Sequence, residues 1–310
     1  MRLGTNETGV VQIEIAARKF TPAVGNGPVI WLTAVSHIGE PHYYQALQRH
    51  LDAHALVLFE GIGGEAMQRA RRTATNAPAK KSELSSLQTT IARSLGLVFQ
   101  LDAIDYDRRH FRNSDVSMAE LQSWIRGTNA IATSPGLPSQ ATPSGNDEFQ
   151  SLLKMMDASS AQGSLLQGLF QFIGANPRLQ GLTKLVLMEV LAQLRGEIAQ
   201  ARGLPPQMQR LFRILIERRN ETVLKDLKTE IARPHPAKSI SLFYGAAHMI
   251  HFERQLRTMH YKTSEELWLP AFTLDLEKSG VGPFELGLIR TMVQMQMQKM
   301  FPAEEKSERN

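Results

Sequence analysis

Hydrophobic and polar positions alternate near the start of the chain and then give way to two continuous apolar runs. Val11 to Phe20 begins with an apolar residue at every second position, the pattern of a half-buried strand. Val29–Val35 and Leu56–Gly61 are unbroken β-prone runs, typical of strands buried on both faces. Between them, apolar residues after Glu40 fall at helical spacing, and Pro41 suits a first helical turn. This order predicts a βαβ unit with parallel strands and a right-handed crossover.

The middle of the chain has a different pattern, dominated by helical spacing. Residues 102–106 are predicted to form a short strand, and Ser117 and Glu120 have the spacing of a capping box that opens a helix. Residues 127–147 are rich in Pro, Gly, Ser and Thr, which indicates a loop or linker. Residues 149–231 then predict about three consecutive helices, separated at two stretches that contain Gly and Pro.

Strand patterns return near the C-terminus, at Ile240–Tyr244 and Leu267–Leu274, and a Met-rich helix over Phe284–Met300 closes the chain. The chain is therefore predicted to be α/β, with a mixed central sheet built from N- and C-terminal segments. A helical insertion is expected between about residues 127 and 235. A length of 310 residues suits a single domain over residues 1–310.

Composition and charge remove several classes of protein. The 35 Lys and Arg residues exceed the 30 Asp and Glu residues only slightly, and the one dense basic stretch, residues 69–81, contains no aromatic residue. No nucleic-acid partner is therefore expected. The absence of cysteine excludes disulfides, zinc fingers and Cys nucleophiles. No apolar run approaches the roughly 18 residues of a membrane span, and no hydrophobic signal region begins the sequence, so a cytoplasmic, soluble protein is expected.

Three ionisable residues follow hydrophobic strands: His37, Glu60 and His248. The carboxyl ends of parallel strands collect ligand groups, so these side chains are expected to converge if all three strands are parallel. Two imidazoles and one carboxylate form a common ligand set for Zn²⁺, Mn²⁺ or Fe²⁺. Each residue also has a plainer interpretation. His37 suits a satisfied loop histidine, Glu60 a helix cap or an arginine partner, and His248 the first residue of a helix.

Three stretches of the chain carry a family resemblance: Val35-Ser36-His37-Ile38-Gly39, Leu58-Phe59-Glu60-Gly61 and Tyr244-Gly245-Ala246-Ala247-His248. Together they resemble the TraB/PrgY/GumN family, which is related to the TIKI proteases. The family is recognised by two G-x-x-H motifs and an intervening glutamate on an α/β fold. Gly245 and His248 match the second motif, whereas Ala34 stands where the first usually has glycine. Arg112 to Ser117 resembles the family's turn before a helix, and Glu217 to Asn220 resembles its E-R-[ND] segment.

The resemblance implies a metal-dependent hydrolase, in particular a peptidase acting on a peptide or small carbonyl substrate. It implies a divalent transition metal (Mn, Zn, Co or Fe) held by His37, Glu60 and His248. The metal would activate water, and Glu60 would serve as a ligand or as the general base. Arg219 and Asn220 are implied as further catalytic residues, one of which would hold the developing oxyanion. The remaining motif positions are Ala34, Gly245, Arg112 and Asn113.

Two other functions fit the same residues. The histidines would also suit haem or iron binding on the same fold, and Ala34 would also suit a non-catalytic interaction protein whose site has decayed. The methionines of the last helix are predicted to pack in the core or to form a homodimer contact, since Met serves both purposes.

Overall fold

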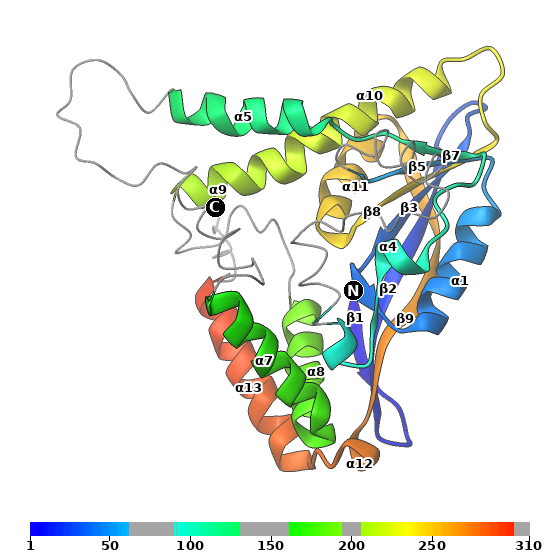
Figure 1. Cartoon of the computed structure of the whole chain (residues 1–310). Coiled ribbons are helices and arrows are strands. Elements are labelled where there is room, and N and C mark those ends of the chain that lie inside the picture. Colours follow the sequence, from blue (N-terminus) through cyan, green and yellow to red (C-terminus); the bar gives the residue numbers. More distant parts are fainter. Residues whose placement is uncertain (62–89, 91, 131–160, 194–205, 301–310) are drawn as a thin grey trace, which may run out of the picture.

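The computed structural model describes residues 1–61, 90, 92–130, 161–193 and 206–300 (Figure 1). The basic stretch 69–81 and residues 131–147 of the predicted linker lie outside these described residues. The strands are β1 (Arg2–Thr5), β2 (Val10–Pro22), β3 (Val29–Val35), β4 (Ile38–Gly39), β5 (Leu56–Phe59), β6 (Val98–Phe99), β7 (Phe111–Asn113), β8 (Ser239–Gly245) and β9 (Tyr261–Asp275).

Seven of these strands form a mixed central sheet, as predicted. β3, β8, β5 and β7 are parallel neighbours in that order, whereas β2 pairs antiparallel with β1, β3 and β9. The predicted parallel strands β3 and β5 are present but not adjacent, because β8 from the other end of the chain lies between them. β4 and β6 form a separate antiparallel pair.

The helices agree with the predicted pattern at most positions. The break before Pro177 is confirmed, and the capping box is formed, with the Ser117 hydroxyl donating to Glu120 and accepting from its backbone N–H. Residues 102–106 are not a strand, because α4 and a following turn occupy them. The predicted loop begins too early, because α5 continues to Ala130. The helices are α1 (Pro41–Asp52), α4 (Gln100–Ala103), α5 (Met118–Ala130), α7 (Ala161–Ala175), α8 (Pro177–Gln193), α9 (Pro206–Arg213), the π-helix η2 (Ile214–Arg218), α10 (Arg219–Ile231), the 3₁₀-helix η3 (Ala246–His248), α11 (Met249–Thr258), α12 (Leu276–Ser279) and α13 (Pro283–Met300).

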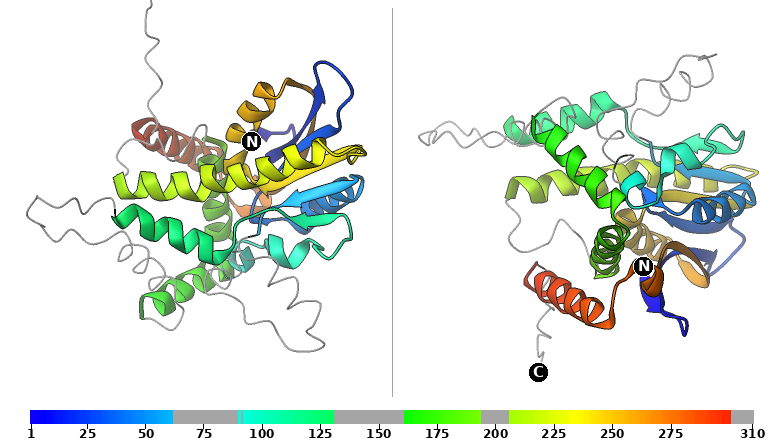
Figure 2. Two further views of the ribbon diagram at one scale, coloured as in Figure 1. Left: turned by 90° about the horizontal axis from the view of Figure 1, so that it is seen from above. Right: turned by 60° about the horizontal axis from the view of Figure 1, so that its bottom comes forward.

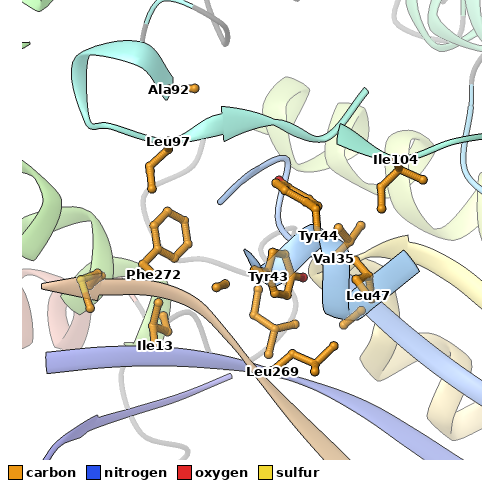
Figure 3. Close-up of a cluster of buried hydrophobic side chains, with 14 of the residues drawn as sticks. Ile13, Val35, Tyr43, Tyr44, Leu47, Ala92, Leu97, Ile104, Leu269 and Phe272 are labelled. Atoms are coloured by element: carbon orange, nitrogen blue, oxygen red, sulfur yellow. The ribbon is translucent and has the colours of Figure 1, made fainter. Parts of the chain in front are cut away.

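Helices cover both faces of the sheet and bury two separate hydrophobic clusters. On one face, Tyr43 and Leu47 of α1 (Figure 3) and Leu185 of α8 pack against β2, β3, β5 and β9. On the other face, Leu227 of α10 and Phe252 of α11 pack against β3, β5 and β8. The central strands are therefore buried on both faces, which explains their continuous apolar runs.

The Met-rich helix α13 packs along α8 and lies at the periphery of the molecule (Figures 1 and 2). Met297 and Val293 are buried, whereas Met292 and Met295 are 57% and 52% exposed. The helix thus has one packed face and one apolar exposed face. No described helix combines the length and the apolar composition that crossing a membrane requires.

Candidate functional site

The candidate site lies at the edge of the sheet where β3, β8 and β5 end. Val35 at the end of β3 pairs with Gly245 at the end of β8, and Phe59 at the end of β5 pairs with Phe243. Parallel neighbouring strands place their carboxyl ends side by side. The residues that follow these strands therefore meet, although they come from segments far apart in the sequence.

The three predicted residues do surround one point, next to the α-carbon of Gly245. A Cβ placed on Gly245 would lie 3.2 Å from Oε2 of Glu60, 3.7 Å from Nε2 of His37 and 3.7 Å from Cδ2 of His248. The expected convergence of His37, Glu60 and His248 is therefore present. Glycine at position 245 leaves the space among them free of a side chain.

Glu60 is held by two donors and faces a third polar group. Its Oε1 accepts a hydrogen bond of 2.7 Å from Nη2 of Arg219, and its Oε2 accepts one of 2.7 Å from the backbone N–H of Gly245. Nε2 of His248 lies 3.5 Å from Oε1. Burial by itself would raise the pKa of Glu60, but His248, Arg219 and His37 together hold that pKa well below its usual range. Glu60 is therefore ionised at neutral pH, and the arginine pairing considered for it does occur.

Arg219 is itself enclosed between two carboxylates. Its Nε and Nη2 atoms lie 3.0 and 2.6 Å from the two oxygens of Asp115, whose side chain is fully buried, and Nη1 donates to the backbone oxygen of Leu215. Burial would lower the pKa of Arg219, but Asp115 and Glu60 raise it instead, so the guanidinium stays charged. The π-helix η2 immediately precedes Arg219, and π-helical turns are frequent at functional sites.

His37 is the exposed member of the site. Its Nδ1 lies 2.9 Å from Oε1 of Gln100, and its backbone oxygen accepts from the backbone N–H of Gln100 at 2.8 Å. The short β4–β6 pair, with Ile38 opposite Phe99, brings Gln100 beside His37. Nε2 of His37 therefore faces Gly245, while the other ring nitrogen, Nδ1, is bound to Gln100.

His248 is buried and is held in the same way. Its Nδ1 lies 2.6 Å from Oδ1 of Asn220, while Nδ2 of Asn220 donates to the backbone oxygen of His248 at 3.3 Å. The same Nδ2 lies 3.0 Å from Nδ1 of His251. Asn220 is 0% exposed, so the oxygen and the nitrogen of its side-chain amide both have their partners inside the protein.

The residue types at this site fit a transition metal. Imidazole nitrogens and a carboxylate are suitable donors. The 3.5 Å between His248 Nε2 and Glu60 Oε1 is close to the separation of two ligands bonded at about 2.1 Å in tetrahedral geometry. As arranged, however, the described side chains contain no group of three or more His, Asp and Glu residues that could hold an ion. The pairing of Glu60 with Arg219 and Gly245 draws its oxygens toward those donors.

The remaining motif positions lie in different surroundings. Ala34 is buried in β3, and His260 is the one described non-glycine residue with a positive φ, so the backbone at Ala34 does not require glycine. Asn113 donates a hydrogen bond of 2.7 Å to the backbone oxygen of Gly61 and so fixes the segment after Glu60. Arg112 faces Glu230 of α10, with its Nη1 3.4 Å from a carboxylate oxygen of that residue.

The sequence patterns did not indicate two contributors to this site, Gln100 and Asp115. Asp115 lies within the turn that resembles the family's, and that turn was the available signal. Gln100 has no local signal, because its position beside His37 depends on the pairing of β4 with β6.

Comparisons of the chain with protein-family models, with curated proteins and with solved structures each found no match. The family resemblance therefore rests on the motifs described above.

Proposed function

We propose that the chain is a metal-dependent hydrolase, in particular a peptidase of the TraB/TIKI type. The observation that carries this proposal is the convergence of His37, Glu60 and His248 on the open space at Gly245. They come from three neighbouring parallel strands, at the edge where such sheets place their ligands. A divalent transition metal held there would lower the pKa of bound water toward about 7 and polarise a substrate carbonyl.

The electrostatics favour Glu60 as a ligand rather than as the general base. An efficient base has a pKa near the operating pH, because it must accept a proton during each turnover. His248, Arg219 and His37 hold the pKa of Glu60 well below its usual range, so its carboxylate is a weak base. Its permanent charge suits cation binding instead.

Arg219 and Asn220 support the site by holding other residues. Arg219 is bound to Glu60 and Asp115, and both polar ends of the Asn220 amide are occupied by His248 and His251. These contacts favour positioning over direct stabilisation of an oxyanion. Substrate would approach from the side of His37, because that residue is exposed whereas His248 is 4% exposed.

Elemental analysis of protein purified under metal-replete conditions tests this function. We expect near-stoichiometric transition metal in the wild type, and its loss in His37→Ala, Glu60→Gln and His248→Ala. Hydrolysis of peptide or ester substrates should stop on chelation and return when metal is added. His235→Ala, which removes an exposed histidine outside the site, should retain both the metal and the activity.

Gly245→Ala makes this test independent of the loss of a ligand. The new methyl group would lie among the three side chains, 3.2 Å from Oε2 of Glu60. The backbone at Gly245 has φ −51° and ψ 145°, which alanine adopts freely, so the protein should fold and yet lose the metal.

A wild-type protein without transition metal would contradict the hydrolase. A Soret band on reconstitution with haem would support the cofactor-binding alternative.

We also propose a homodimer through the exposed face of α13. Four apolar side chains lie at i, i+4, i+8 and i+11 along this helix, which places them on one face. Sedimentation of the wild type should show a dimer, which Met292→Lys should dissociate and Gln294→Lys, off that face, should not. A monomeric wild type at all concentrations would exclude this contact. The four exposed residues are Phe284, Leu288, Met292 and Met295.

A further inference from the structure

Both histidines of the site are held through Nδ1 by the oxygen of a buried side-chain amide. Gln100 provides this oxygen for His37 at 2.9 Å, and Asn220 provides it for His248 at 2.6 Å. Gln100 is 5% exposed and Asn220 is 0% exposed. An amide oxygen can only accept a hydrogen bond, so Nδ1 of each ring must carry the proton.

The orientation of the Asn220 amide is fixed by a contact of its NH₂ group. Nδ2 of Asn220 faces the backbone oxygen of His248, which can only accept, so the amide cannot turn round without bringing two oxygens together. Nε2 of Gln100 donates to the hydroxyl of Tyr106 at 2.7 Å, and its backbone N–H donates to the backbone oxygen of His37. In this arrangement each amide directs its oxygen at an imidazole, and for Asn220 the carbonyl of His248 leaves no alternative.

The proton on one ring nitrogen decides what the other nitrogen can do. A neutral imidazole with its proton on Nδ1 has a free lone pair on Nε2, and the hydrogen bond at one nitrogen sets this choice. Nε2 of His37 faces Gly245, and Nε2 of His248 faces Glu60. Metal-binding histidines commonly make a hydrogen bond through the ring nitrogen that does not bind the metal, and this bond fixes their tautomer and ring orientation.

We infer that Gln100 and Asn220 are positioning residues that keep a proton on Nδ1 of His37 and of His248, so that Nε2 is the nitrogen of each ring directed into the site. Gln100 belongs to none of the motifs and reaches His37 only through the fold. The tautomers follow from the hydrogen bonds alone, whereas their use for binding a metal rests on the proposed function.

Long-range ¹H–¹⁵N correlation spectra of histidine-labelled protein, freed of metal by a chelator, test this inference. Spectra are recorded at about pH 8, above the usual histidine pKa of about 6.5, and assigned with His37→Gln and His248→Gln. We expect the proton on Nδ1 of both residues in the wild type. In Gln100→Leu, most of His37 should change to the Nε2–H tautomer while His248 remains unchanged.

Two further variants separate positioning from a general disturbance. Gln100→Glu keeps an acceptor oxygen and should keep the proton on Nδ1 of His37. Gln180→Leu removes a glutamine that contacts the backbone oxygen of Ser94 and should change neither histidine. In addition, metal affinity should fall roughly 10- to 100-fold in Gln100→Leu and recover in Gln100→Glu.

The outcomes distinguish this inference from the proposed function. A proton on Nε2 of His37 in the wild type, or an unchanged tautomer in Gln100→Leu, would overturn the positioning role even in an active enzyme. If Gln100→Leu does not fold, the wild-type and Gln100→Glu spectra decide the same question. Nδ1–H tautomers in a protein that binds no metal would uphold the positioning role and refute the hydrolase.

Discussion

Replacing Asp115 by asparagine is expected to lower the free energy of unfolding by about 3 to 5 kcal/mol, the usual effect of removing one partner from a buried ion pair. The side chain of Asp115 is fully buried, and its oxygens accept from Arg219 and from the backbone N–H groups of Gly61 and Val116. Asparagine keeps the shape but presents an NH₂ group to one of these donors. It also leaves the buried guanidinium of Arg219 with Glu60 as its one remaining carboxylate partner among the described residues.

Urea unfolding measures this change, and a matched control shows whether it depends on burial. Asp105 pairs with Arg108 at 3.3 Å, but both side chains are about half exposed. Asp105→Asn should therefore cost less than about 1 kcal/mol. If Asp115→Asn costs no more than this control, the buried Asp115–Arg219–Glu60 arrangement does not stabilise the fold as we infer.

Acidification is expected to destabilise the protein through a second pair of histidines, His50 in α1 and His54 just after the end of that helix. Their Nε2 atoms lie 3.4 Å apart, and both rings pack against Trp31. Burial lowers the pKa of His50 to about 4, and burial together with His50 and His110 lowers the pKa of His54 to about 4. Glu265 acts in the opposite direction on His50 but does not offset the burial.

The direction of the pH effect follows from these values. An unfolded histidine has a pKa of about 6.5, so between about pH 6.5 and 4 the unfolded chain binds protons that the folded protein does not. The stability contributed by neutral His50 and His54 is present above pH 6.5 and is lost as the pH falls. The loss by pH 4.5 should be on the order of 3 kcal/mol for the pair, allowing for partial solvent screening.

Comparing urea unfolding at pH 7 and 4.5 in the wild type and in a His50→Gln/His54→Gln variant isolates this effect. The variant should lose about 3 kcal/mol less on acidification than the wild type, because other titrating groups are common to both. His235→Gln, at an exposed position, should behave as the wild type does. Equal losses in all three proteins would show that the buried histidines do not govern acid stability.

Much of the fold could be predicted from local patterns. The continuous apolar runs that became β3, β5 and β8 are signatures of strands buried on both faces, and two hydrophobic clusters do cover those faces. The strand predicted at residues 102–106 is absent, because a run of apolar and polar residues this short suits a strand or a turn of helix equally. In the structure α4 and its turn occupy it, and Tyr106 points into the core.

The sequence by itself determined the strands β2, β3, β5, β8 and β9, the break between α7 and α8, the capping box at Ser117 and the ionisable residues that follow the strands. Each of these depends on neighbours only a few residues away. Only the tertiary structure decided that β8 lies between β3 and β5, so that Gly245 donates to Glu60 across 185 residues of chain. It likewise decided that Glu60 pairs with Arg219 and that Gln100 supports His37. Such partners are selected by which hydrophobic faces pack together and by the need to satisfy buried charges, and neither is written in local periodicity.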